Sequence, residues 1–431
     1  MKQLGLFSSR ALFENRSVRD VTFQGKMTRP IHRWYRLTPS FSPKLALDIA
    51  DHFSLARTDL VLDPFSGVGT VPLCMKYRGV PAWSVEINPY LYFVGEVKTR
   101  DYHDVDSIRD CLLKFVALLR EEAGRLPEEG KAEQYLSENE QFVPPIHRPL
   151  RWWSAGNLMQ LTCLRRLLLT QTDLPVDQMD LLKLSVLSIL VPVSNARHNH
   201  VSLTFAAEAL PTVSVADVLE EKCREMISDL RRVSELPRAT VRAFLGNSKE
   251  VSTVLPSNRQ VSAVITSPPY PNRFSYARET RPHLFFLNFV TRARQVGELE
   301  TDAIGGTWGK ATSVLSKGIR PANDFLSEIL SPYVGSIDQD CNLMGSYVTK
   351  YFNNIYSHAA ELAKVCHKRC RLAYVIGNSK FFGKPLPSDE LLAAVFEHHG
   401  FDREGISRMR RRQSKSGLYE AVVFLRRRKT E

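Results

Sequence analysis

Val264-Ile265-Thr266-Ser267-Pro268-Pro269-Tyr270 is the stretch of sequence that decides the fold. Residues 261–265 form an apolar run that predicts a buried strand, and this run ends at a small polar residue, two prolines and a tyrosine. Two consecutive prolines cannot continue a strand, because neither has an N–H and each fixes its own φ. We therefore expect a rigid turn at the carboxyl end of a strand, where open α/β sheets bind their ligands.

A second stretch, residues 61–70, has the same layout of strand and turn. Its sequence, Val-Leu-Asp-Pro-Phe-Ser-Gly-Val-Gly-Thr, predicts a short strand that enters a glycine-rich turn, and residues 71–77 predict a helix. Glycines allow a sharp turn and let the backbone pass close to a ligand. The chain has no third glycine at dinucleotide-binding spacing and no Gly-Lys-Ser/Thr phosphate loop, which argues against NAD and ATP.

A third stretch, residues 82–89, predicts a second strand that ends at Glu86. Glu86 follows Asp63 by 23 positions (86 − 63), a usual distance for one βαβ unit. A carboxylate at this strand end accepts hydrogen bonds from the two hydroxyls of a ribose. The alternative interpretation is a surface glutamate with no ligand.

These turns resemble two motifs of the DNA amino-methyltransferases, which methylate exocyclic nitrogens of cytosine or adenine. Asp-Pro-Phe-x-Gly-x-Gly-Thr is similar to the S-adenosylmethionine-binding motif of that family, and Ser-Pro-Pro-Tyr is similar to its catalytic motif. The resemblance implies an α/β fold, a Rossmann-like class I methyltransferase sheet of seven mostly parallel strands. It also implies sequence-specific binding of double-stranded DNA and a cognate restriction endonuclease as a partner.

The resemblance places the catalytic role on Ser267, Pro268, Pro269 and Tyr270. An exocyclic amine is a poor nucleophile, because its lone pair is delocalised into the ring. The Ser267 hydroxyl oxygen and the Pro268 carbonyl are expected to accept its protons, while Tyr270 stacks on a base that has left the helix. Enzymes that methylate the 5-position of cytosine need a cysteine after a proline, and this chain has no Pro-Cys pair.

The residues expected to hold S-adenosylmethionine follow predicted strands, with one exception at a helix start. The exception is Ser42, a predicted N-cap before Pro43, whose cofactor role rests on the resemblance alone. The role of Asn247, or of Ser248 beside it, rests only on position after residues 241–245. The full set is Ser42, Asp63, Pro64, Phe65, Gly67, Gly69, Thr70, Glu86, Asn88 and Asn247.

The target base depends on Ser267. In the family, serine at the first motif position is commoner in N4-cytosine enzymes and aspartate in N6-adenine enzymes, so cytosine N4 is expected. Adenine N6 is the alternative, and an RNA methyltransferase of the same fold is a second one. A related Asn-Pro-Pro-Tyr turn methylates RNA bases and glutamine side chains, but serine matches an amide less well. A non-catalytic DNA-binding protein is a further alternative, against which the intact motifs argue.

The rest of the chain predicts insertions around this core. We expect a cofactor-binding half in residues 1–101 and a helical insertion for DNA recognition or cover in residues 102–238. Strands three and four and the catalytic motif fall in residues 239–289. Residues 290–345 predict an irregular, variable loop region for target contacts, and residues 346–431 complete the core.

The amino-acid composition and net charge agree with a globular protein that binds nucleic acid. Of the 431 residues, 43% are hydrophobic and 24% charged, as in ordinary globular proteins. No run reaches the roughly 18 to 20 apolar residues that span a bilayer. The net charge of +12 favours a polyanionic partner such as nucleic acid. We expect no membrane association, a nucleoid-associated cytoplasmic protein of a bacterium or archaeon, and a monomer or a dimer.

The seven cysteines are scattered along the chain, which is typical of a reducing compartment. Cys366, His367 and Cys370 lie close enough in sequence to suggest a metal site, but further ligands are missing nearby. We therefore expect two buried cysteines on a helix and no metal.

Overall fold

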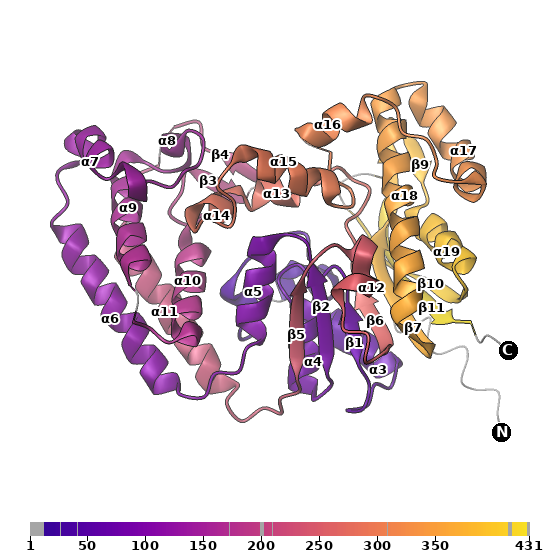
Figure 1. The fold of residues 1–431 in the computed structure, drawn as a ribbon, viewed down its shortest axis with the longest axis horizontal. Helices are drawn as coiled ribbons and strands as arrows, with labels where there is room; N and C mark the ends of the chain where they lie inside the picture. Colours follow the sequence, from indigo (N-terminus) through magenta and orange to yellow (C-terminus); the bar gives the residue numbers. More distant parts are fainter. Residues whose placement is uncertain are drawn as a thin grey trace.

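The computed structural model describes residues 13–428, except residues 26, 41, 172, 199–201, 209, 308 and 413–415. At its centre is a seven-stranded sheet in the order β10-β11-β7-β6-β1-β2-β5 (Figure 1). Strand β11 is antiparallel to both of its neighbours, and every other pair of neighbours is parallel. The predicted mostly parallel seven-stranded sheet is thus confirmed. The strands are β1 (Val61–Asp63), β2 (Ala82–Glu86), β5 (Val241–Leu245), β6 (Val261–Thr266), β7 (Cys366–Gly377), β10 (Phe401–Arg411) and β11 (Tyr419–Arg427).

The strand order reverses beside β1. From β1 the chain moves outward to β2 and then to β5, and it then crosses back to β6 on the other side of β1. Val61 pairs with Ala263 and Leu62 with Val264, so β1 and β6 run in the same direction. The turns that follow the two strands therefore lie side by side at one edge, the usual ligand-binding position of such sheets.

Helices cover both faces of the sheet (Figure 1). Helices α3 (Pro43–His52) and α4 (Thr70–Arg78) pack on one face around Ile49 and Val71. The other face packs on α12 (Val251–Val254), α18 (Asn342–Val365) and α19 (Ser388–His398), with Phe352 and Phe396 fully buried. Helix α5 (Pro89–Thr99) follows β2 and contacts β5.

Residues 102–238 form a mainly helical block beside α5 (Figure 1). The block shares one hydrophobic core with α5 and with the N-terminal segment. The buried Asp229 carboxylate joins them, because it accepts hydrogen bonds from the Ile31 N–H, the Arg33 guanidinium and the Trp34 indole. The elements are α6 (Val105–Gly124), α7 (Ala132–Glu138), α8 (Pro149–Trp152), α9 (Ala155–Thr170), α10 (Val176–Ile189), β3 (Ala196–His198), β4 (Leu203–Phe205) and α11 (Val215–Arg232).

The expectation of an irregular region over residues 290–345 is wrong. This region contains three helices: α15 (Ala293–Asp302), α16 (Lys310–Leu315) and α17 (Asp324–Asp338). Pro332 lies inside α17, and glycines separate α15 from α16, so the local signals pointed to loops. Apolar packing of Leu326, Leu330 and Ile337 against the α18 side of the core overrides those signals.

The expected helical position of Cys366 and Cys370 is also wrong. Both residues lie in β7, buried at 5% and 0% exposure, because the strand begins farther back than its apolar run. Among the described residues, no cluster of three His, Cys, Asp or Glu side chains is placed to hold a metal ion.

A search of the described helices finds none long and apolar enough to cross a membrane. Short elements complete the structure: α2 (Val18–Val21), α13 (Tyr276–Glu279), α14 (Arg281–Phe286), β8 (Ser379–Phe381) and β9 (Lys384–Leu386).

Candidate active site

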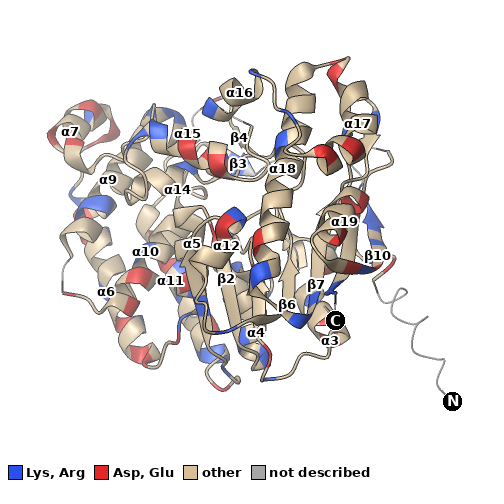
Figure 2. Ribbon diagram, turned by 45° about the vertical axis from the view of Figure 1, so that its right-hand side comes forward, with Lys and Arg blue, Asp and Glu red and all other residues tan. Residues whose placement is uncertain are grey.

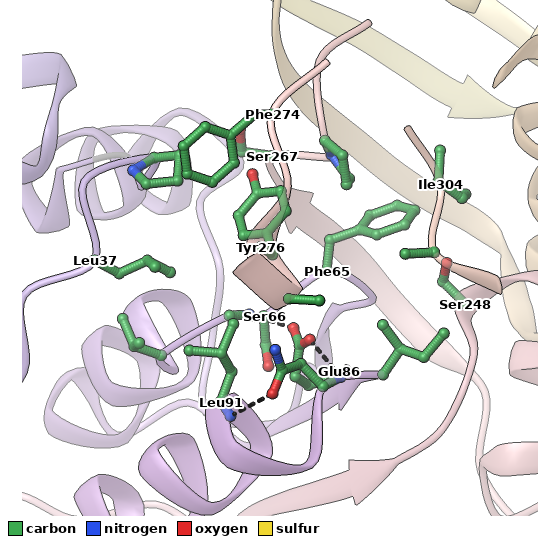
Figure 3. Close-up of a pocket in the computed structure, with 18 of the residues that line it drawn as sticks. Leu37, Phe65, Ser66, Glu86, Leu91, Ser248, Ser267, Phe274, Tyr276 and Ile304 are labelled. Carbon is green, nitrogen blue, oxygen red and sulfur yellow. Dashed lines mark hydrogen bonds between the residues drawn. The ribbon is translucent and has the colours of Figure 1, made fainter. Parts of the chain in front are cut away.

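A pocket opens at the carboxyl ends of β1, β2, β5 and β6, and we call it the active pocket (Figure 3). It brings together most of the residues expected from the sequence, although they come from four different strand ends. Those that line it are Pro64, Phe65, Gly67, Thr70, Glu86, Asn88, Asn247, Ser267 and Pro269. Those that do not line it are Ser42, Asp63, Gly69, Pro268 and Tyr270.

The two glycines of the turn after β1 have different tasks. Both have a left-handed backbone, with φ of +51° at Gly67 and +74° at Gly69, which side-chain-bearing residues rarely adopt. A Cβ on Gly69 would lie 3.0 Å from the Gly95 Cα in α5, so Gly69 lets α5 pack against the turn. Gly67 lines the pocket and leaves its wall without a side chain. Of the pair, Gly67 is the one that faces the pocket.

Glu86 joins the turns that follow β1 and β2. One carboxylate oxygen accepts a hydrogen bond from the Gly67 N–H and the other from the Asn88 N–H, each at 2.8 Å. Burial raises the pKa of Glu86 to about 7, although these backbone hydrogen bonds act in the opposite direction. Each oxygen keeps a second lone pair for a ligand. Glu86 thus lines the pocket with lone pairs open to a hydrogen-bond donor, and its role in ribose binding stays a prediction.

The side-chain oxygen and nitrogen of Asn88 form hydrogen bonds within the protein rather than with a pocket ligand. Its side-chain oxygen caps α5 by accepting from the N–H groups of Tyr90 and Leu91, and its amide nitrogen donates to the Thr280 hydroxyl at 2.9 Å. Asn247 also uses its side-chain oxygen locally, accepting from the Lys249 N–H at 3.1 Å. Both residues therefore shape the wall, with limited capacity left for further hydrogen bonds.

Asp63 lies behind the pocket wall and is 2% exposed. It accepts a hydrogen bond from the Thr266 hydroxyl at 2.6 Å and one from the Phe65 N–H at 3.2 Å. Burial raises the pKa of Asp63 to about 7. Asp63 thus ties the end of β1 to the end of β6, a positioning role that the sequence did not predict.

Ser42 is the predicted N-cap of α3, and its side chain accepts from the Lys44 N–H at 3.1 Å. Its side chain is buried away from the active pocket at 1% exposure. The neighbouring Leu37, Pro39 and Ser40 line the pocket instead. The segment before α3 thus reaches the pocket through these residues and not through Ser42.

The Ser-Pro-Pro-Tyr turn is held by β7 and α18. The Ser267 hydroxyl donates to the Val375 carbonyl at 3.0 Å, which commits its hydrogen to the protein. The hydrogen bond that it shares with Tyr270 then uses one lone pair of its oxygen and leaves the other available. The Pro269 carbonyl accepts from the Tyr351 hydroxyl at 2.8 Å. Within the part of the chain that the structure describes, the Pro268 carbonyl accepts no protein hydrogen bond. The turn therefore offers two acceptors, Ser267 and Pro268.

Tyr270 does not face the active pocket. Its ring packs at the end of β7, where a Cβ on Gly377 would lie 3.1 Å from the tyrosine Cε2. Burial raises the pKa of its hydroxyl, while a hydrogen bond with Ser267 acts in the opposite direction. The rings that line the pocket are those of Phe65, Phe274 and Tyr276 (Figure 3).

Phe274 and Tyr276 form an edge-to-face pair with centroids 4.9 Å apart, and both lie near Ser267 (Figure 3). The expected stacking partner is therefore not in place, and a different aromatic pair occupies that end of the pocket. The available sequence signal was two aromatic residues, two positions apart, directly after the catalytic turn.

Residues 299–306, from the end of α15 onward, cover the side of the pocket opposite the sheet. Glu300, 4% exposed, fixes this cover by accepting from the Ser275 hydroxyl at 2.8 Å and the Thr307 N–H at 3.0 Å. Ile304 lines the pocket in Figure 3. Sequence reasoning missed these residues because they fall where irregular structure was expected.

A buried histidine supports the pocket from behind. His358 in α18 contacts the Ser248 carbonyl through Nδ1 at 2.9 Å and the Tyr374 hydroxyl through Nε2 at 2.7 Å. Because a carbonyl only accepts, Nδ1 carries the proton, and burial lowers the pKa of His358 to about 4. Its ring also packs edge-on against Phe65 with centroids 4.8 Å apart. Neutral His358 therefore holds two parts of the pocket wall.

Comparison with curated proteins finds relatives along nearly the whole chain. The Type II methyltransferase M.BsoBI of Geobacillus stearothermophilus is 23% identical over 447 residues, which cover 94% of this chain and 86% of that protein. This chain is similar to type II methyltransferases along nearly its whole length. The Type II methyltransferase M.AvaI of Anabaena variabilis is 20% identical, over 92% of this chain and 84% of its own length. No family model matches the chain.

This relationship to type II methyltransferases confirms the predicted resemblance, the methyltransferase fold and S-adenosylmethionine as the cofactor. Solved structures give weaker likenesses. TrmN from Thermus thermophilus is 9% identical with a TM-score of 0.28, over 89% of this chain and 48% of that chain. The rRNA methyltransferase aviRa from Streptomyces viridochromogenes is 10% identical with a TM-score of 0.28, over 90% and 86%. Because these TM-scores are low, the fold is assigned from the strand order of the sheet.

Proposed function

We propose that this protein is a site-specific DNA methyltransferase that transfers a methyl group to the N4 amine of a flipped-out cytosine in double-stranded DNA. The observation that carries the proposal is the orientation of Ser267. Its hydrogen is given to the Val375 carbonyl, so toward the pocket the oxygen presents only lone pairs. An N–H donor is the group that such an oxygen receives.

The residues of the active pocket fit S-adenosylmethionine. Glu86 keeps lone pairs for the ribose hydroxyls, Gly67 opens the wall, and Phe65 offers an apolar ring for the adenosyl group. Asn247 and Ser248 lie after β5 at the adenine end. When bound there, S-adenosylmethionine would supply an electrophilic methyl group to the amine nitrogen.

The catalytic turn acts by holding the amine. The Ser267 oxygen accepts one of its N–H groups, so that the nitrogen lone pair is directed at the methyl group and away from the ring. The Pro268 carbonyl, which lies outside the pocket lining and accepts no protein hydrogen bond from the described residues, is the acceptor proposed for the other N–H group once the base is bound. The base must leave the duplex to reach this depth, and the Phe274–Tyr276 pair offers it an aromatic surface. The extra proton on the methylated nitrogen leaves to solvent. Positioning is then the main source of the rate enhancement.

Adenine N6 is the alternative target, because its amine presents the same two N–H donors to the same acceptors. The serine at the first motif position favours cytosine, by the family tendency described above. A restriction endonuclease that cuts the same site is the partner this function implies. Its absence or presence does not alter the chemistry at Ser267.

The test combines substrate class and product. Purified protein and S-adenosylmethionine labelled in the methyl group are incubated with duplex DNA, single-stranded DNA and structured RNA, with Ser267→Ala as the inactive control. Label should enter duplex DNA, and sequencing of DNA from cells that express the chain should show N4-methylcytosine at one recurring sequence. N6-methyladenine in its place would move the assignment to adenine. Label in RNA alone, or no saturable cofactor binding, would overturn the proposal.

A further inference from the structure

A second pocket lies on the outer side of α13, and we call it the arginine pocket. Four arginines line it, two from the helical block and two from the segment that follows the catalytic turn. They are Arg148, Arg151, Arg278 and Arg281. Figure 2 shows acidic segments around α7 and basic segments between α7 and α15, the part of the molecule that contains α8 in Figure 1.

The positive charge of this pocket is largely uncompensated. Among the residues that the structure describes, Arg148, Arg151 and Arg281 form no ion pair with a carboxylate. The Nε of Arg281 is buried and has no hydrogen-bond partner. Several arginines elsewhere in the helical block form ion pairs, as Arg120 does with Asp217 and Glu220. Arg148, Arg151 and Arg281 thus bring three guanidinium groups without a carboxylate partner to one pocket, which favours the binding of an external anion there.

One carboxylate, that of Glu279, lines the arginine pocket, but it is engaged in a hydrogen bond within the protein. It accepts a hydrogen bond from the Leu203 N–H at 2.8 Å, which ties α13 to strand β4. Burial raises the pKa of Glu279. One acid against four arginines leaves a net positive pocket, so Glu279 supports its frame without neutralising it.

The pocket has a rigid aromatic wall. The Arg151 guanidinium lies 4.5 Å from the centre of the Phe205 ring, and Trp152 packs edge-on against that ring at 4.9 Å. Trp152 is 8% exposed, whereas Arg151 and Arg148 are exposed. A guanidinium held on an aromatic face keeps its donors outward, and its planar fork matches two oxygens of a phosphate.

The arginine pocket and the active pocket share a helix. Tyr276 and Ala277 of α13 line the active pocket, while Arg278 and Glu279 of the same four-residue helix line the arginine pocket. A helix with its side chains is about 10 to 12 Å across. A phosphate bound at the arginines would thus lie on the order of 10 Å from the methyl-transfer site, and successive phosphates of one DNA strand are spaced about 3.4 Å apart along the axis.

We propose that the arginine pocket binds a backbone phosphate of the substrate duplex within a few nucleotides of the flipped base. This inference rests on the proposed function, since it takes the polyanion to be double-stranded DNA. Phosphate contacts carry no sequence information but fix the register of the duplex on the protein. The pocket therefore holds the strand beside Ser267, while base contacts are made elsewhere.

The test is the salt dependence of DNA binding in a triple variant, Arg148→Gln, Arg151→Gln and Arg281→Gln. The matched control is Arg259→Gln, Lys368→Gln and Arg369→Gln, which removes three exposed charges at the amino ends of β6 and β7, the opposite edge of the sheet. Dissociation constants for duplex DNA fragments are measured from low to high salt. The slope of log affinity against log salt should fall by about 1 in the triple variant, since one lost phosphate contact contributes about 0.9. The control should keep a slope closer to that of the unaltered protein.

Two further measurements keep the outcomes distinct. The affinity for S-adenosylmethionine should be unchanged in the triple variant, which shows that the protein is folded. Arg281→Lys alone keeps the charge but loses the planar guanidinium with its paired N–H donors, and it should weaken DNA binding less than Arg281→Gln. If the unaltered protein methylates duplex DNA and the triple variant shows the same slope as the control, the arginine proposal fails and the proposed function stands. If the unaltered protein neither binds nor methylates duplex DNA, both fail.

Discussion

The cofactor half and the catalytic half of the active pocket are built in different ways. In the cofactor half, Glu86 bonds the backbone of Gly67 and Asn88, which lie 19 and 2 positions away. In the catalytic half, Ser267 bonds Val375, which lies 108 positions away, and Pro269 is held by Tyr351, 82 positions away. The contacts of Glu86 thus link neighbouring loops, whereas the contacts of Ser267 and Pro269 form only when β7 and α18 are in place.

The two halves also differ in charge. Two buried carboxyl groups, those of Asp63 and Glu86, support the cofactor half, and burial raises the pKa of each to about 7. The acceptors of the catalytic half, Ser267 and the Pro268 carbonyl, are neutral. Cofactor binding should therefore respond to pH near neutrality, whereas the acceptors of the catalytic turn should not.

The largest expected effect is on turnover. Ser267→Ala should lower the rate of methyl transfer about 10²- to 10³-fold, the range seen when one preorganised hydrogen-bonding group is lost from a catalytic site. The dissociation constant of S-adenosylmethionine should stay within about twofold. Single-turnover rates and calorimetric titration measure the two quantities. Ser262→Ala, which removes a hydroxyl near the other end of β6, is the control and should retain turnover. Equal loss of rate and affinity in Ser267→Ala would mean that Ser267 is structural.

The second effect is on affinity. Glu86→Gln should weaken S-adenosylmethionine binding roughly 10- to 100-fold, since hydrogen bonds to a charged acceptor contribute about 1.5 to 3 kcal/mol. Turnover at saturating cofactor should change little. Asp63→Ala should also weaken binding, through loss of the contact with Thr266. Titration calorimetry measures each variant, with the exposed Glu250→Gln as the control. Unchanged affinity in both Glu86→Gln and Asp63→Ala would refute the assignment of this half to the cofactor.

The third effect is a pH dependence. The pKa of Glu86 is raised from 4.5 to about 7, so its protonated form is favoured below neutrality. The ionised form is the better acceptor for ribose hydroxyls, so cofactor affinity should rise between pH 6 and pH 8. Binding measured across that interval should be steep in the unaltered protein and flatter in Glu86→Gln. An unchanged profile in that variant would assign the titration to another group.

The stability of the fold should change with pH in the opposite direction to cofactor affinity. A carboxyl group whose folded pKa lies above its unfolded pKa stabilises the fold below the unfolded pKa, and this contribution is lost as pH rises through the folded pKa. For Asp63 that interval runs from about 3.8 to about 7. Thermal unfolding without cofactor should show stability falling over it, less so in Asp63→Asn.

The smallest effect tests the long-range support of the catalytic half. Tyr351→Phe removes one hydrogen bond to the Pro269 carbonyl, worth about 1 kcal/mol, and should lower turnover roughly fivefold. Cofactor affinity should stay the same. Tyr356→Phe, five residues farther along α18, is the matched control. A drop in affinity in Tyr351→Phe without loss of rate would show that the two halves are not separately supported.

The sequence by itself determined the cofactor half and the strand that carries the catalytic turn. Its strands end where the apolar runs end, Ser42 and Asn88 cap helices through side-chain hydrogen bonds, and Gly67 takes the left-handed turn. These features depend on contacts over a few residues or one βαβ unit, and such contacts leave a readable pattern.

Only the tertiary structure decided the rest. It turned the ring of Tyr270 toward Gly377, placed His358 and Tyr351 behind the pocket, and drew residues 299–306 over it. It also gathered Arg148 and Arg281 into one pocket from segments far apart in the chain. These arrangements follow from packing between distant elements, and the local periodicity of a chain carries no signal for which distant element will supply a partner.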